Sequence, residues 1–243
     1  MTLAEHLDEL RTRLLRCVVA TFVAAAIAFW RAKDVVSFLQ APLEAAMRKY
    51  PGTRLVQTTV AEGFMATMLV SLFAGLAVAG PYILHQLWGF VAAGLYPKER
   101  RSVKYYALPG FVLFFSGASL AYFWVMPWAL DFLIGYAADT TGLESLITLG
   151  PYISLGAWMM FVFGLVFQLP LVMIFLMRLG VVEPAFFRRY RRHALVIAFI
   201  VGGLLTPPDV ISQFALSGTL IALYEGAILV GARVAQRRGP AGA

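Results

Sequence analysis

The chain has 243 residues, of which 60% are hydrophobic and only 14% are charged, and its mean hydropathy is +0.78. A soluble domain has about half apolar and about a quarter charged residues, so this composition excludes an ordinary soluble domain. The net charge of +7 requires no nucleic-acid partner, because basic residues collect in the cytoplasmic loops of membrane proteins. The single cysteine, Cys17, excludes an intrachain disulfide and a cysteine metal cluster.

Runs of about 20 apolar residues identify membrane-spanning helices, and this sequence has several of them. They predict an all-α polytopic membrane protein with a single transmembrane domain over residues 1–243. The six predicted spans cover residues 14–30, 64–83, 105–125, 153–176, 194–206 and 210–224. A cleaved signal peptide is disfavoured, because Glu5, Asp8 and Glu9 lie in the region that should be basic and the apolar run continues to Trp30.

The connection after the first span has the pattern of an amphipathic helix. Apolar residues recur at helical intervals at Val35, Val36, Leu39, Leu43, Ala46 and Met47. This spacing predicts an interfacial helix over about residues 34–50 in the outer loop. We expect Pro42 to kink this helix and Pro51-Gly52 to end it.

The last two spans form a short hairpin. The fifth span has 13 residues, which rise about 20 Å as a helix, whereas the hydrocarbon core is about 30 Å thick. It must therefore thin the bilayer, recruit flanking residues or lie behind other helices. The TPPD stretch at residues 206–209 predicts a tight turn, because Pro207 and Pro208 have no amide proton with which to continue a helix. The sixth span either stops near Tyr224 or continues through Glu225.

Basic residues predict the orientation of the chain. Six spans place both termini on one side of the membrane, and with a cytoplasmic N-terminus the inner segments carry 15 Lys and Arg residues against 5 in the outer segments. The outer five are Arg31, Lys33, Arg48, Lys49 and Arg54. Because positive residues stay on the cytoplasmic side, both termini are predicted to be cytoplasmic.

Several polar residues lie where a membrane span offers few partners. Gln168 lies inside the fourth span beside Pro170, where its amide either satisfies a carbonyl that the proline frees or has a function. Thr206, Ser212 and Gln213 lie at the outer end of the last hairpin. There they either form hydrogen bonds with neighbouring helices or face the outer interface.

Motifs for several other functions are missing from the sequence. It has no G-x-x-x-x-G-K-[ST] phosphate loop, no H-E-x-x-H and no G-x-S-x-G, and its three histidines show no metal-ligand spacing. We therefore expect no enzyme, no metal and no cofactor. A small-solute or ion transporter is the alternative function, but it predicts a midplane pathway lined by charges, and the predicted spans contain almost none.

Two carboxylates lie within the most basic segments. Glu9 belongs to EHLDELRTRLLR and Glu99 to AGLYPKERRSVKYY, both at ends of apolar spans on the predicted cytoplasmic face. Each either pairs with a neighbouring cation, as Glu9 would with Arg13 four residues on, or awaits a dicationic partner. A carboxylate accepts a guanidinium through two parallel hydrogen bonds, a geometry that lysine lacks.

The sequence resembles the TatC family, the signal-receptor component of the twin-arginine protein translocase. The resemblance rests on HLDELRTRLL (6–15), APL (41–43), QLWGFVAAGLYPKERR (86–101), AYF (121–123), FQLP (167–170) and LLTPPDVISQ (204–213). These segments keep their order over nearly the whole chain, and six spans with a short final hairpin agree with them.

The resemblance implies a receptor and scaffold rather than an enzyme. Such a protein would bind twin-arginine signal peptides of folded precursors in the cytoplasmic membrane. It would recruit TatA- and TatB-type single-span partners for export driven by the proton-motive force. The implied signal-peptide site consists of Glu9, Arg11, Phe90, Glu99 and Arg101. The implied partner-binding or structural residues are Pro42, Phe64, Tyr122, Gln168, Thr206, Asp209 and Gln213.

One of these positions departs from the family pattern, because many members have glutamate where this chain has Gln168. We therefore expect no role there that needs a titratable group, whereas a hydrogen bond to a partner remains available. Besides the signal peptides and the two single-span partners, the implied interactions are with the lipid bilayer and with further copies of the chain. No nucleic-acid partner is expected.

Overall fold

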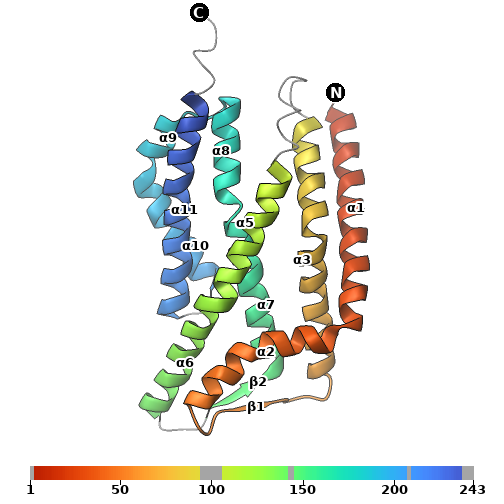
Figure 1. Cartoon of the computed structure of the whole chain (residues 1–243), viewed down its shortest axis with the longest axis vertical. Coiled ribbons are helices and arrows are strands. Elements are labelled where there is room, and N and C mark those ends of the chain that lie inside the picture. The colour runs from red at the N-terminus through yellow and green to blue at the C-terminus, as the bar shows by residue number, and fades with distance from the viewer. Residues whose placement is uncertain (1–2, 94–105, 142–144, 207–208, 237–243) are drawn as a thin grey trace, which may run out of the picture.

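Figure 1 shows a computed structural model of the chain, which describes residues 3–93, 106–141, 145–206 and 209–236. Almost all of these residues are helical. The helices are α1 (Leu3–Trp30), α2 (Ala32–Lys49), α3 (Glu62–Ala93), α5 (Ala107–Leu120), α6 (Met126–Thr141), α7 (Leu149–Val166), α8 (Leu169–Leu179), α9 (Pro184–Arg189), α10 (Arg191–Leu205) and α11 (Val210–Gln236). A π-helix, η2 (Ala121–Val125), joins α5 to α6, and the strands β1 (Arg54–Val56) and β2 (Leu146–Thr148) form a parallel pair.

Five helical stretches of the described chain are long and apolar enough to cross a membrane. They are Glu5–Trp30, Glu62–Phe90, Ala107–Thr140, Leu149–Leu179 and Val210–Val234. This finding confirms the prediction of an all-α polytopic membrane protein. The helix that corresponds to the predicted fifth span, α10, has 15 residues. It rises about 22 Å, which is less than a hydrocarbon core about 30 Å thick.

Four helices extend well beyond the predicted spans. Helix α1 already begins at Leu3, whereas α3 continues to Ala93, α6 to Thr141 and α11 to Gln236. Apolar residues define the part of a helix that suits the membrane, but backbone hydrogen bonding carries the helix on through polar residues at its ends. The spans predicted from hydropathy alone are therefore shorter than these helices.

Pro127, which lies just past the third predicted span, does not end that helix. The π-helix η2 precedes it, and the Met126 amide donates to the carbonyl of Ala121, five residues earlier. A proline has no amide proton for the ordinary bond to the carbonyl four residues earlier. The wider π-turn accommodates this defect, so α5, η2 and α6 continue as one long helical segment (Figure 1).

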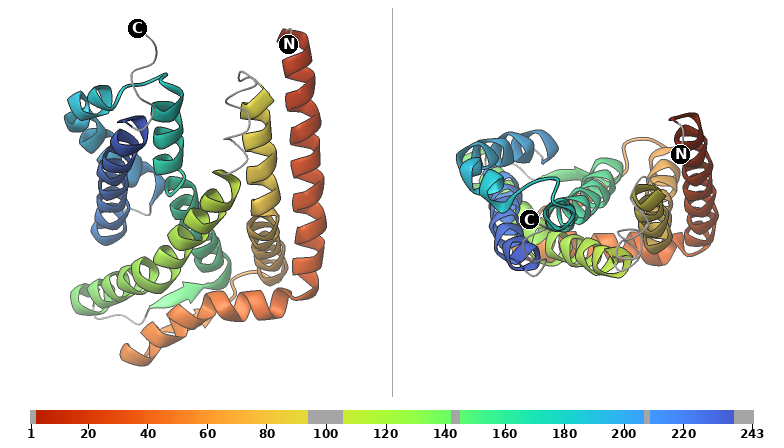
Figure 2. Two further views of the ribbon diagram at one scale, coloured as in Figure 1. Left: turned by 45° about the horizontal axis from the view of Figure 1, so that its top comes forward. Right: turned by 90° about the horizontal axis from the view of Figure 1, so that it is seen from above.

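The first and last described helices end on the same side of the molecule. In Figure 1 the start of α1 and the end of α11 lie at the top, whereas α2 and the strand pair lie across the bottom. Helix α1 packs mainly on α3, and Gly75 of α3 permits their close approach, since a Cβ there would overlap the backbone of Ala25. Seen from above in Figure 2, α1 and α3 form one edge, and α9, α10 and α11 form the opposite edge.

Two tyrosines support the proline inside α2. Pro42 is buried, and the helix continues through it. A proline cannot donate to the carbonyl four residues earlier, here that of Phe38. The Tyr122 hydroxyl donates to this carbonyl at 2.6 Å, and the Tyr152 hydroxyl donates to the next one, that of Leu39, also at 2.6 Å. Tyr122 thus supplies the donor that the proline lacks, and the two tyrosines together attach α2 to η2 and α7.

Side-chain bonds also hold together segments that are distant in the sequence at the α2 end of the molecule. Glu62, the first residue of α3, accepts hydrogen bonds from the Thr58 amide at 2.6 Å and from the Gly150 amide of α7 at 2.7 Å. Lys49, the last residue of α2, forms an ion pair with Asp131 of α6 at 2.5 Å. The hydrogen bond to this carboxylate raises the pKa of Lys49.

Candidate functional site

A polar cluster lies where the first turns of α1 pack against the end of α3. Arg13 donates to Oε1 of Glu9 from Nε at 2.9 Å and from Nη2 at 2.6 Å, so Glu9 does pair with the cation four residues on. Through Nη1, Arg13 also donates to Oε1 of Gln86 in α3 at 3.0 Å. Gly89 makes room for this guanidinium, because a Cβ there would collide with it. One arginine therefore links the two helices and orients the carboxylate.

Glu9 nevertheless keeps one oxygen for a further partner. Its side chain is 19% exposed, and Oε2 is buried with no hydrogen-bond donor among the described residues. An ionised carboxylate has about four acceptor sites on its two oxygens, and a buried acceptor without a donor costs free energy. Once its neighbours move to admit a donor, Oε2 could therefore accept additional N–H groups without loss of the bonds that Arg13 makes to Oε1.

An aromatic pair lies next to this carboxylate. Phe90 of α3 stacks on His6 of α1, with ring centroids 4.4 Å apart. His6 precedes Glu9 by three residues, so the stacked rings lie about one helical turn from the carboxylate. The site thus combines an available anionic acceptor with an aromatic surface, both at the α1–α3 contact.

Of the other three predicted residues of this site, the structure describes one. Arg11 is exposed on α1, and Glu99 and Arg101 lie outside the described residues. Arg13 and Gln86 were not among the site residues predicted from the sequence. Gln86 had a detectable signal, since it is a polar residue late in an apolar helix and opens the QLWGF segment, and the structure buries it to 7% exposure.

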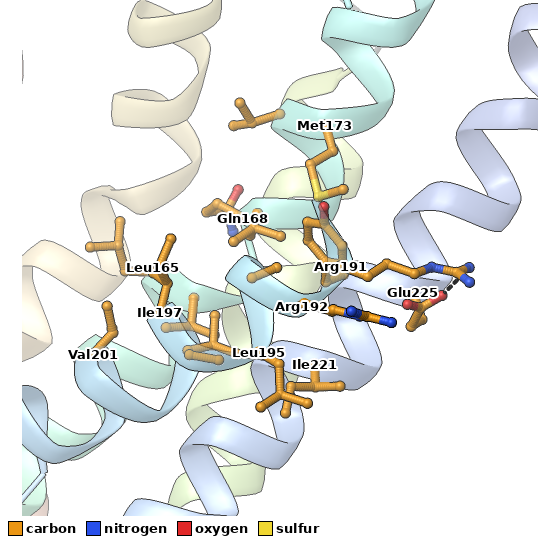
Figure 3. Close-up of a pocket in the computed structure, with 17 residues that line it drawn as sticks. Leu165, Gln168, Met173, Arg191, Arg192, Leu195, Ile197, Val201, Ile221 and Glu225 are labelled. Carbon is orange, nitrogen blue, oxygen red and sulfur yellow. Dashed lines mark hydrogen bonds and ion pairs between the residues drawn. The ribbon is translucent and has the colours of Figure 1, made fainter. Parts of the chain in front are cut away.

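Gln168 lies at the break between α7 and α8. Its Nε2 donates to the Gly110 carbonyl of α5 at 2.9 Å and lies 3.5 Å from the Gly164 carbonyl one turn back in α7. Pro170 has no amide proton to donate to the Val166 carbonyl. The Gln168 side chain does not take over this role in the described chain, because its Nε2 donates to Gly110 and Gly164 instead. The amide therefore connects a broken helix to its neighbour, and it also lines a groove of about 750 Å³ beside α10 and α11 (Figure 3).

Polar side chains connect the two helices of the last hairpin. Asp209 caps α11, since its Oδ1 accepts the Ser212 amide at 2.6 Å. Gln213 Nε2 donates to the Phe199 carbonyl of α10 at 3.3 Å, and Thr206 Oγ1 donates to the carbonyl four residues earlier at 2.8 Å. Thr206 and Ser212 are both buried, so the interpretation that they face the outer interface is wrong.

Two buried polar atoms of the hairpin have no partner among the described residues. They are Oδ2 of Asp209, a residue 4% exposed, and Oγ of Ser212, which is fully buried. Groups of this kind usually find a hydrogen-bond partner in native proteins. The start of α11 therefore carries unused hydrogen-bonding capacity at the turn of the hairpin.

The remaining predicted residues lie near the α2 end. Pro42 and Tyr122 belong to the proline support described above. Phe64, near the start of α3, is 61% exposed and contacts Phe29 of α1 edge to face, with centroids 6.5 Å apart. Among the residues that the structure describes, no three His, Cys, Asp or Glu side chains are grouped so that they could hold a metal ion.

Comparison with known proteins agrees with this architecture. Residues 5–218 match the family described as Sec-independent protein translocase protein (TatC). The chain is 37% identical to the TatC protein of Azotobacter chroococcum mcd 1, over 99% of this chain and 93% of that protein. It is 35% identical to TatC of Escherichia coli K12, over 92% and 85% of the two chains.

A solved structure is similar over nearly the whole fold. The crystal structure titled twin arginine translocase receptor TatC superposes with a TM-score of 0.82 at 34% identity, covering 94% of this chain and 99% of that one. The family match spans most of the sequence, and the helical architecture is shared. The chain therefore belongs to the TatC family of Sec-independent protein translocase proteins.

Proposed function

We propose that this chain is the receptor of its translocase and binds twin-arginine signal peptides of folded precursors at the Glu9 cluster. As a TatC-family protein it is a membrane component of a translocase and not an enzyme. The observation that carries the proposal is Oε2 of Glu9, a buried carboxylate oxygen with no described donor. A signal-peptide guanidinium supplies the N–H donors that this oxygen lacks.

The surroundings of Glu9 favour arginine over lysine. Arg13 bonds to Oε1 and to Gln86, so the carboxylate is held in one orientation. A planar guanidinium can direct N–H groups at a fixed carboxylate and stack on an aromatic face, whereas an ammonium is a compact point charge. The stacked rings of His6 and Phe90 provide such a face. Glu99 is proposed to bind the second arginine of the motif.

The last hairpin is proposed to bind the TatA- and TatB-type single-span partners. The support is the set of buried polar groups on α10 and α11, above all Asp209 Oδ2 and Ser212 Oγ, which have no partner in the part of the chain that the structure describes. Thr206 and Gln213 lie within one turn of them in sequence. A polar side chain on a partner helix would gain hydrogen bonds at this position that lipid cannot provide. Gln168 would offer a further amide at membrane depth.

We place both ends of the chain on the cytoplasmic side of the cell membrane, with export driven by the proton-motive force. The distribution of Lys and Arg supports this orientation. The start of α1 and the end of α11 lie on one side of the molecule, as an even number of crossings requires (Figure 1). The Glu9 cluster would then face the compartment in which precursors fold.

The experiment that tests the receptor function compares two peptides and two matched variants. Binding of a signal peptide with Arg-Arg and of its Lys-Lys twin is measured on the purified protein, on Glu9→Gln and on Asp8→Asn. Asp8 is an exposed carboxylate one residue away and serves as the control. Charge-assisted hydrogen bonds contribute about 1.5–3 kcal/mol, so Glu9→Gln should weaken Arg-Arg binding roughly ten- to a hundredfold.

Asp8→Asn should leave the preference for Arg-Arg intact. The same comparison for Glu99→Gln tests the second carboxylate. If the unmodified protein binds both peptides equally, the receptor proposal fails. If it prefers Arg-Arg but Glu9→Gln does not reduce that preference, the peptide site lies elsewhere in the chain.

A further inference from the structure

An apolar groove lies between the α7–α8 break and the last hairpin. It has a volume of about 750 Å³ and is lined by residues of α7, α8, α10 and α11 (Figure 3). Several lining side chains are largely exposed for apolar residues: Leu165 at 57%, Leu195 at 47% and Ile197 at 58%. An apolar occupant from the surrounding membrane could cover these exposed side chains.

The groove is basic at one end. Arg191 and Arg192, the first residues of α10, both line it there, together with Glu225 of α11. Arg191 pairs with Glu225 at 2.6 Å, and this ion pair is drawn in Figure 3. Arg192 is exposed and has no carboxylate within ion-pair distance among the described residues. This end of the groove thus carries two guanidinium groups and one carboxylate, so its net charge is positive.

The depth of the groove matches one leaflet of a bilayer. From Arg191 to Val201 the lining follows eleven residues of α10, whose ten steps rise about 15 Å. Half of a hydrocarbon core about 30 Å thick is also about 15 Å. A single-span protein helix must cross both leaflets, whereas the chain of one lipid ends at the midplane.

The volume also favours a narrow occupant. The groove of about 750 Å³ is within the range of about 300–1,000 Å³ that is typical of small-ligand sites. A 20-residue helix about 10 Å across and about 30 Å long would fill roughly 2,400 Å³. An acyl chain can therefore lie within the groove, whereas a helix could contact it with only one of its faces.

We propose that this groove binds one anionic phospholipid, with its phosphate at Arg192 and an acyl chain along Leu195 and Ile197 toward Leu165. Basic residues at the membrane interface attract anionic headgroups, and a basic pocket between transmembrane helices is a recognised setting for specific binding. Arg192 donates to the phosphate, while Arg191 stays paired with Glu225 and holds α10 against α11. The bound lipid would fill the space between the α7–α8 break and the short helix α10.

The test is native mass spectrometry of the purified chain titrated with phosphatidylglycerol or with phosphatidylcholine of the same acyl chains. Arg192→Gln removes the proposed phosphate ligand. Arg233→Gln is the matched control, because Arg233 is an exposed arginine near the end of α11 and does not line the groove. Leu195→Trp fills the groove without changing the charge.

The unmodified chain should retain one phosphatidylglycerol molecule more tightly than phosphatidylcholine. Arg192→Gln should weaken the anionic lipid by about five- to tenfold and Arg233→Gln should not. Leu195→Trp should reduce binding of both lipids. Equal binding of the two lipids by the unmodified chain, or an equal loss in both arginine variants, overturns the proposal. The proposal also fails if the Leu195→Trp variant still binds the lipid but no longer binds a single-span partner protein, because the groove would then hold a helix.

Discussion

The hydroxyl of Tyr122 should stabilise the protein only because Pro42 lies in α2. Tyr122→Phe removes the hydroxyl that donates to the Phe38 carbonyl at 2.6 Å but keeps the ring, which stacks on Phe38 with centroids 4.1 Å apart. Tyr122 is 6% exposed, so the carbonyl would lose its donor in a buried setting. Leaving a buried acceptor unsatisfied costs about 1–3 kcal/mol. For a chain of this length, each kcal/mol lowers the Tm by about 2–4 °C.

The expected decrease is therefore about 2–12 °C, measured by thermal unfolding in mild detergent. In the Pro42→Ala background the restored amide can donate to the Phe38 carbonyl itself. Tyr122→Phe should then cost less than about 0.5 kcal/mol, so the two changes should couple by about 1 kcal/mol or more. Tyr136→Phe, which removes a hydroxyl from a side chain 63% exposed on α6, is the control and should leave the Tm unchanged.

Equal losses from Tyr122→Phe in both backgrounds would refute this reasoning. The hydroxyl would then act independently of the proline, and the assignment of the Phe38 carbonyl as the group that the proline leaves unpaired would be wrong.

Three further predictions concern other parts of the fold. Gly75→Ala should lower the Tm, because its Cβ would overlap the α1 backbone at a cost of about 1–3 kcal/mol. Gly218→Ala in α11, whose Cβ would meet no neighbouring segment within 4 Å, should instead raise helix stability by about 0.5–1 kcal/mol. Asp209→Ala should cost about 0.5–2 kcal/mol through loss of the α11 cap, and Asp209→Asn should restore most of it in the same melting assay. Lys49 has a raised pKa in the folded state, so its stabilising effect is present below its ordinary value of 10.5 and is lost as the pH rises through the raised value. The Tm advantage of the unmodified chain over Lys49→Met should therefore shrink between about pH 9 and pH 12, and a constant difference over that range would contradict the assignment.

Hydropathy indicated the long apolar helices of the described chain, because apolar runs are local properties of the sequence. The amphipathic pattern at residues 34–50 likewise corresponds to α2, and Pro51-Gly52 follows its last residue, with Gly52 at a positive φ of 108°. Helix ends were less predictable, since backbone hydrogen bonding continues into polar residues. The π-turn before Pro127 could not be inferred, because a proline marks a defect without saying how the helix accommodates it.

Helical spacing predicts the pairing of Glu9 with Arg13, and the structure confirms this contact. Glu9 was selected as a carboxylate in a basic segment and Phe90 from the resemblance to the TatC family, and their role in a signal-peptide site stays a prediction. The role of Gln86 could not be derived, since it depends on how α1 and α3 align across 73 positions of sequence. The same limit applies to Gln168, whose bond partner Gly110 lies on a different helix. Such contacts are set by tertiary packing, which no local pattern encodes.

The packing of α1 mainly on one helix has a consequence for the order in which the chain folds during synthesis. Within the described ranges helix α1 packs almost entirely on α3, and these α1–α3 contacts require only the first 93 residues of the chain. Chains fold from the N-terminus during synthesis, and local pairings form before distant ones. The α1–α3 pair can therefore assemble while the rest of the chain is still on the ribosome. The contacts of α8 with α11, by contrast, must wait for the final helix, so the Glu9 cluster is built before the hairpin at the opposite edge.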